Sequence, residues 1–73
     1  MKLYVRLTEV LKERGMTQKE LAELTGIRAA GISELANNQR KSINREHLEK
    51  IAAVLNITDI SELIEFKKEG DPN

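Results

Sequence analysis

The sequence contains no cysteine and no tryptophan, and it has only one tyrosine and one phenylalanine. Without cysteine, neither a disulfide framework nor a thiolate metal site can stabilise the fold, and this composition fits the cytoplasm. A chain of 73 residues buries only about 60% of the surface that it exposes when unfolded. We therefore expect one small cytoplasmic domain over residues 1–73, stabilised by the packing of helices.

Long apolar segments and catalytic motifs are also absent. The longest uninterrupted apolar run is 51–55, far shorter than the roughly 20 residues that a membrane-spanning helix needs. There is no glycine-rich phosphate loop, and the only histidine, His47, lacks the carboxylate-and-hydroxyl signature of a catalytic base. Glutamates spaced three apart have no histidine or cysteine with them to complete a metal site. The sequence therefore predicts neither an enzyme nor a cofactor, a metal or a membrane partner.

Charge is balanced overall but unevenly distributed. Twelve lysines and arginines offset twelve aspartates and glutamates, whereas DNA-binding domains are usually basic. Residues 26–45 carry four cations and one carboxylate, a net charge of +3, while residues 59–73 carry two cations and five carboxylates, a net charge of −3. The sequence is thus electrically polar, with a modestly basic middle and an acidic end.

The segment 17–38, TQKELAELTGIRAAGISELANN, organises the chain. Thr17 and Glu20 have the spacing of a capping box, which starts a helix by satisfying two free backbone N–H groups. Gly26 can take a positive φ at little cost, so the chain can turn sharply there. A second helix is expected over 28–37, stopped by the two asparagines that end the segment and that tolerate the left-handed conformation.

The turn at Gly26 is too short to let two helices of about eight to ten residues fold back on each other. We therefore expect the two helices to cross steeply. Apolar residues of both helices form a shared corner: Leu21, Leu24, Ile27, Ile32 and Leu35. Plotted at about 100° per residue, Ile32 and Leu35 fall on one side of the second helix. The opposite side, called here the outward face, is small and polar and consists of Ala30, Ser33, Glu34 and Asn37.

Further helices are expected on both sides of this unit. Apolar residues at i, i+3 and i+4 from Leu7 predict a helix that stops at Gly15. A later helix over 45–55 has Asn44 as its N-cap and Asn56 as its C-cap. A last short helix begins at a second capping box and turns its apolar residues inward: Asp59 and Glu62 form the box, and Ile60, Leu63 and Ile64 point to the core.

The ends of the chain leave two interpretations open. Residues 3–5 are either a first helical turn or a short extended arm, since β-branched and aromatic residues favour strands. Residues 67–73 are expected to be a flexible tail, or residues 64–68 form a short strand paired with 3–5. The fold class predicted from these elements is all-α, a compact five-helix bundle whose termini are extended in the second interpretation.

Several phrases of the sequence together resemble the phage-repressor and Cro-type helix-turn-helix family, also called the XRE family. They are TQKELAELTGI at 17–27, IS-x-L at 32–35, NN-x-RK at 37–41, LEKIAAVLNI at 48–57 and ISELIEF at 60–66. The resemblance covers roughly residues 3–66. It implies a lambda-repressor-like DNA-binding domain with its helix-turn-helix at 17–37, which regulates transcription, here as a small repressor, usually as a dimer on a palindromic operator.

The resemblance also assigns roles to individual residues. Base-reading positions fall on Arg28, Ala29, Ala30 and Glu34, and phosphate-binding positions fall on Gln18, Ser33, Asn37, Asn38, Arg40 and Lys41. We expect Arg28 to donate hydrogen bonds to a guanine and Glu34 to accept one from N4 of a cytosine. The phosphate contacts would fix the position of the domain on the duplex.

Double-stranded operator DNA is the expected partner, and the apolar ends of the chain at 3–5 and 63–66 suggest a homodimer. The alternative is a protein-interaction module that holds a partner protein as an antitoxin holds its toxin. Its surface would be the C-terminal end, 62–71, with Phe66 and Tyr4. DNA binding that weakens as salt rises distinguishes the first interpretation from the second.

Overall fold

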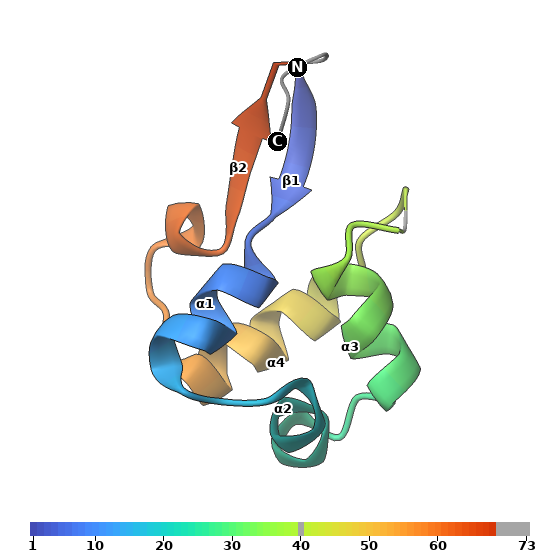
Figure 1. Ribbon diagram of the computed structural model, residues 1–73, viewed down its shortest axis with the longest axis vertical. Helices are drawn as coiled ribbons and strands as arrows, with labels where there is room; N and C mark the ends of the chain where they lie inside the picture. The colour runs from blue at the N-terminus through green and yellow to red at the C-terminus, as the bar shows by residue number, and fades with distance from the viewer. Residues whose placement is uncertain (40, 69–73) are drawn as a thin grey trace.

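The computed structural model describes residues 1–39 and 41–68, and the counts below refer to these. Its elements are β1 (Lys2–Val5), α1 (Leu7–Arg14), α2 (Gln18–Thr25), α3 (Ala29–Ala36), α4 (Arg45–Leu55), a 3-10 helix (Ile60–Glu62) and β2 (Ile64–Lys67). The four α-helices form the body of the molecule, and the two strands extend from it side by side (Figure 1). Arg40 and residues 69–73 of the predicted tail lie outside the described residues.

The predicted compact five-helix, all-α bundle is wrong: the described residues form four α-helices and a small two-stranded sheet, and the fifth predicted helix is absent from them. Residues 2–5 and 64–67 form an antiparallel two-stranded sheet, with Leu3 opposite Phe66 and Val5 opposite Ile64. The extended interpretation of the termini is therefore the one that holds. Both segments are rich in β-branched and aromatic side chains, which favour strands over short terminal helices.

The predicted last helix is a single 3-10 turn. The Asp59 side chain accepts a hydrogen bond from the backbone N–H of Ser61 at 2.9 Å and one from its hydroxyl at 2.8 Å. These two bonds hold the pKa of Asp59 below its ordinary value. Leu63 then donates its N–H to the carbonyl of Ile60, and the strand β2 begins one residue later. The Asp59 carboxylate thus stabilises a single 3-10 turn, after which the chain continues as β2 and not as an α-helix.

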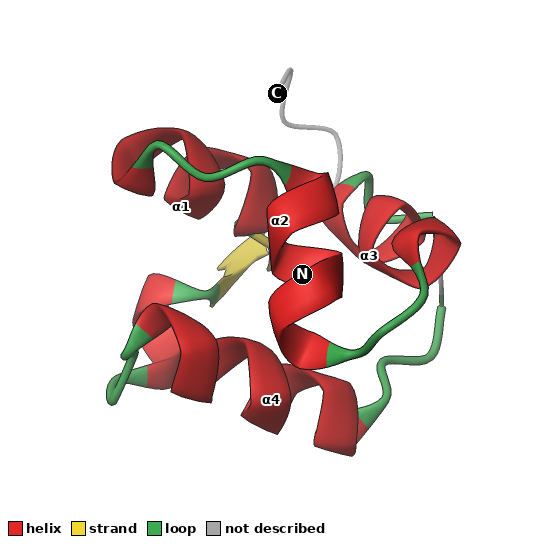
Figure 2. Ribbon diagram, turned by 90° about the horizontal axis from the view of Figure 1, so that it is seen from below, coloured by secondary structure: helices red, strands yellow, loops and turns green. Residues whose placement is uncertain are grey.

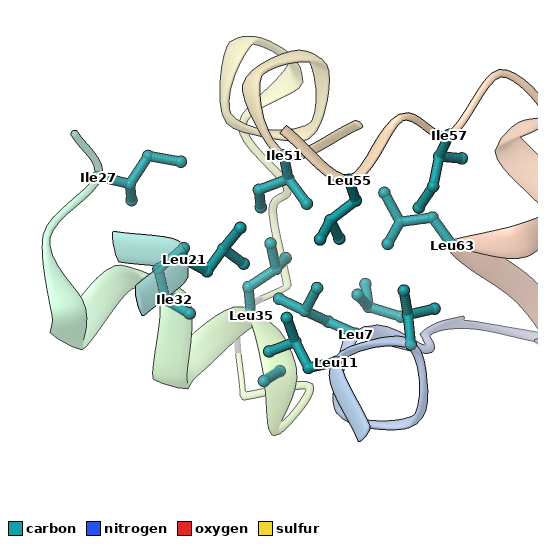
Figure 3. Close-up of a cluster of buried hydrophobic side chains, with 13 residues drawn as sticks. Leu7, Leu11, Leu21, Ile27, Ile32, Leu35, Ile51, Leu55, Ile57 and Leu63 are labelled. Atoms are coloured by element: carbon teal, nitrogen blue, oxygen red, sulfur yellow. The ribbon is translucent and has the colours of Figure 1, made fainter. Parts of the chain in front are cut away.

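Thirteen buried apolar side chains of the described residues form one core, and every α-helix contributes to it. The largest fully buried side chains, Leu7, Leu21, Ile32 and Ile51, come one each from α1, α2, α3 and α4. Figure 3 shows labelled side chains of the four helices directed toward a common centre. Full burial of such a side chain contributes about 1.5–3 kcal/mol, so this core fixes the orientation of α3.

Two residues that the sequence placed in the interior are on the surface. Leu24 and Ile60 are each 61% exposed. In α2 the inward face is centred between Leu21 and Ala22, and Leu24 lies about 60° beyond Leu21 on the far side of the helix. Ile60 opens the 3-10 turn and lies at the surface, whereas Leu63, the residue that ends the turn, is buried in the core.

The ends of α2 and α4 follow the predicted signals, whereas Asp59 bonds to Ser61 and does not form the predicted capping box with Glu62. Thr17 and Glu20 form the complete capping box at 2.9 and 3.0 Å. The side chain of Asn44 accepts a hydrogen bond from the backbone of His47 at the start of α4. Asn56 ends that helix in the left-handed conformation, with φ of 56°. These are local interactions, so the sequence alone was sufficient to predict them.

Tyr4 connects the sheet to α1. Its hydroxyl donates a hydrogen bond of 3.4 Å to Oε2 of Glu9, and the Lys67 ammonium lies 3.7 Å from the centre of its ring. Partial burial and the neighbouring Glu9 carboxylate raise the pKa of the Tyr4 hydroxyl. Next to it, Arg6 donates its backbone N–H to the carbonyl of Leu63 at 2.7 Å. The sheet is therefore attached to the helical body at its base.

Candidate nucleic-acid interface

The joint between α2 and α3 is a turn centred on Gly26. Gly26 has φ of 77° and donates its N–H to the carbonyl of Ala22. The Thr25 hydroxyl donates to the carbonyl of Leu21 and accepts from the N–H of Ile27, so it spans the turn. A side chain at position 26 would be strained at this φ. Figure 2 shows that α2 and α3 meet at a steep angle across this joint.

The buried side of α3 is the one that the sequence predicted, together with one alanine: Ile32, Leu35 and Ala36. On the opposite side, Ala30 and Asn37 are exposed, and Ser33 and Glu34 are partly exposed. Arg28, which precedes the helix, and Ala29 in its first turn are exposed as well. The outward face is therefore at the surface. All four residues predicted to read bases are accessible, Ala30 and Glu34 on this face and Arg28 and Ala29 at the start of the helix.

Gly31 lies beside the outward face. A Cβ built on it would meet one atom, Cγ2 of Ile27, at 3.4 Å, which is an ordinary van der Waals contact. Its φ is not positive, so the helix does not require glycine at this position. A methyl group would fit between α3 and the turn.

The predicted phosphate-binding residues do not share one environment. Lys41 is exposed in the loop before α4, and Gln18 is partly exposed at the start of α2. Ser33 and Asn37 are neighbours on one side of α3, where the Asn37 amide lies 3.4 Å from the Ser33 hydroxyl. Arg40 lies outside the described residues.

Asn38 differs from the other described residues of this set because its side chain is bonded to the backbone of a different element, β1. Its Oδ1 accepts from the N–H of Val5 at 2.7 Å, and its Nδ2 donates to the carbonyl of Val5 at 3.1 Å. The residue stands just after α3 in the left-handed conformation, with φ of 57°. It therefore ties the end of α3 to β1, and its amide has a structural partner where the sequence suggested a phosphate.

An open hollow of about 410 Å³ lies beside the outward face, between α3 and α4. One wall is formed by the turn and α3, with Gly26, Ile27, Arg28, Ala30, Gly31 and Glu34, and the other by His47 and Lys50 of α4. In Figure 2 the turn between α2 and α3 runs between these two helices. Nothing in the sequence groups His47 and Lys50 with α3, because only the packing of α4 brings them there.

A pair of short helices joined by a glycine turn, with the second helix presenting a small polar face, defines a helix-turn-helix DNA-binding protein. The family model of the Cro/C1-type HTH DNA-binding domain matches residues 6–69. The chain belongs to this family and is a DNA-binding transcriptional regulator. The match is to a DNA-binding domain, and it supports the regulator over the protein-interaction module.

Neither the curated proteins nor the solved structures give a match to the chain. Within the described residues, no helix has the length and apolar character needed to cross a membrane. The same part of the chain contains no group of three or more histidine, cysteine, aspartate or glutamate side chains arranged to hold a metal ion.

Proposed function

We propose that this regulator is a small repressor that places α3, with the flanking Arg28 and Asn37, in the major groove of an operator. The observation that carries the proposal is the outward face of α3, which is small, polar and at the surface. The major groove, about 12 Å wide, admits an α-helix. Short side chains such as Ala30 let the helix approach closely, and longer ones beside them reach the base edges.

Arg28 and Glu34 are the proposed hydrogen-bonding readers. A guanidinium donates two hydrogen bonds to O6 and N7 of guanine, and a carboxylate accepts from N4 of cytosine. Ala29 and Ala30 have no polar side-chain atoms, so they would contact thymine methyl groups. Gln18, Ser33, Asn37 and Lys41 would hold the sugar–phosphate backbone, and the same role is proposed for Arg40.

The experiment starts from fragments selected by the protein from random DNA. Retention of a selected duplex should weaken steeply as salt rises, because phosphate contacts release counterions. Glu34→Gln removes the acceptor charge with little change of shape, and it should change the base preference at one position by about 1–3 kcal/mol. Glu13→Gln, in the last turn of α1, is the matched control and should leave the preference unchanged. Salt-independent binding, or no binding, would refute the proposal.

We also propose that the regulator acts as a homodimer in the cytoplasm, joined through its terminal sheet. Leu3 and Phe66 stand opposite each other in the sheet and are 44% and 66% exposed. A second copy of the chain would cover this pair and set two half-sites about 34 Å apart. Sedimentation of the protein alone and on its operator tests this. A monomer in both states would refute the dimer and leave Phe66 available to a different protein.

A further inference from the structure

The geometry points to a DNA contact outside the helix-turn-helix: Lys50 of α4 binds a phosphate of the operator that enters the hollow between α3 and α4. This inference rests on the proposed function, because it requires α3 to lie in the major groove. It extends the DNA-binding surface to α4, where the sequence phrases of the family assign no role.

The hollow is continuous with the proposed base-reading surface. Arg28, Ala30 and Glu34 belong to both, so a duplex that contacts these residues covers the mouth of the hollow. Lys50 and His47 stand on its far wall. The hollow's volume of about 410 Å³ is many times the roughly 10–15 Å³ that a cavity needs to hold one water molecule. A phosphate and the adjoining sugar atoms fit in such a space.

The charges around the hollow favour an anion. Its lining contains two cations, Arg28 and Lys50, from opposite walls and a single carboxylate, Glu34. Lys50 is exposed, and in the described part of the chain it takes part in no ion pair. Arg45, on the same helix, is by contrast already paired with Glu49 at 3.6 Å. Lys50 is thus an un-neutralised cation beside the proposed groove-binding helix.

The backbone at the start of α4 is a weaker candidate for this contact. The N–H of His47 donates to the side chain of Asn44 at 3.2 Å, so the capped helix end does not offer that donor to DNA. The side chains that line the hollow remain, and an ammonium on a flexible stem reaches a phosphate as a point charge. Lys50 is therefore the group we assign to the contact, with His47 beside it as a wall of the hollow.

The test compares Lys50→Ala with Lys12→Ala, which removes an exposed cation from the last turn of α1. α1 contacts α3 near its beginning, where the Thr8 hydroxyl donates to the carbonyl of Ala36, and in Figures 1 and 2 the helix runs away from α3 toward its last turn. Affinity for a selected operator and for an unrelated duplex is measured from low to high salt. Lys50→Ala should reduce the slope of log K against log salt by about 0.9 and weaken both duplexes alike. Lys12→Ala should keep the full slope, and Lys50→Arg should restore it.

A second readout identifies the phosphate. Operators are prepared with one backbone phosphate at a time replaced by an uncharged methylphosphonate. One replacement should weaken the wild type and leave Lys50→Ala unaffected, because the variant has already lost that contact. As a control for folding, the Tm of Lys50→Ala should equal that of the wild type.

The possible failures are distinguishable. If the wild type binds DNA with the expected salt dependence and Lys50→Ala keeps the full slope, the inference about the hollow is overturned and the proposed function stands. If no single methylphosphonate separates Lys50→Ala from the wild type, the inference is overturned too. If the wild type itself shows no salt-dependent binding, the proposed function fails and the inference fails with it.

Discussion

Replacement of Asn38 tests how the end of α3 is held to the sheet. The Asn38 amide makes two hydrogen bonds to the backbone of Val5, across 33 positions of sequence. It does so from a left-handed backbone conformation, with φ of 57°. Asn38→Ala removes both bonds and places an unsuited residue in that conformation. Asn38→Gly removes the same two bonds but is free of the conformational strain.

The magnitudes follow from these two effects. A neutral hydrogen bond contributes about 0.5–1.5 kcal/mol net, so two of them contribute about 1–3 kcal/mol. The left-handed conformation costs a residue such as alanine a further 1–2 kcal/mol, roughly. We expect Asn38→Ala to lower the free energy of unfolding by about 2–5 kcal/mol and Asn38→Gly by about 1–3 kcal/mol. In a domain of this size, each 1 kcal/mol corresponds to about 4–8 °C in Tm.

Urea unfolding followed by circular dichroism measures both variants against the wild type. Amide hydrogen exchange should show the loss at β1 in both, since the N–H of Val5 loses its acceptor. If the free energies of unfolding of both variants lie within about 0.5 kcal/mol of the wild-type value, the two bonds do not hold β1 to α3. If Asn38→Ala is no less stable than Asn38→Gly, the left-handed conformation does not strain alanine at this position.

Three further predictions concern the core, the start of α3 and the turn before β2. Gly31→Ala should raise the free energy of unfolding by about 0.5–1 kcal/mol, because the position is helical and has room for a methyl group; a lower urea midpoint would contradict this. Ile32→Ala should cost about 2–5 kcal/mol, while Leu24→Ala, at a mostly exposed position, should cost less than about 0.5 kcal/mol; equal effects in urea unfolding would refute the assignment of Leu24 to the surface. Since hydrogen bonding lowers the pKa of Asp59 in the folded state, its contribution should be complete above the unfolded value of about 3.9 and disappear as pH falls through the lower folded value. Asp59→Ala should therefore lower Tm at pH 7, and this deficit should shrink as pH falls below the unfolded value; a deficit that stays constant with pH would count against the linkage.

The sequence was sufficient where the interactions are local. Thr17 bonds to Glu20 three residues away, and Asn44 bonds to the N–H of His47 at the same separation. The outward face of α3 was predicted for a similar reason, since helical geometry alone determines which residues oppose Ile32. Such features depend on spacing along one segment, which a sequence states directly.

The sequence was insufficient where segments meet from a distance. The pairing of residues 2–5 with 64–67 competed with a helical interpretation, and only tertiary contact decides between them. The bond from Asn38 to Val5 and the hollow bounded by Lys50 both require knowledge of which elements pack together. Leu24 shows the same limit. Its helical spacing from Leu21 predicted a place in the core, yet its side chain faces solvent.

The pairing of β1 with β2 also constrains the order of events during synthesis. Residues 2–5 leave the ribosome before all the helices, yet their hydrogen-bonding partners at 64–67 emerge after the last of them. Until then residues 2–5 of the nascent chain have no strand to pair with. They include Val5, which is buried in the folded protein. Closing this long loop is the entropically expensive step, so the helix-turn-helix can assemble early while the sheet completes the fold last.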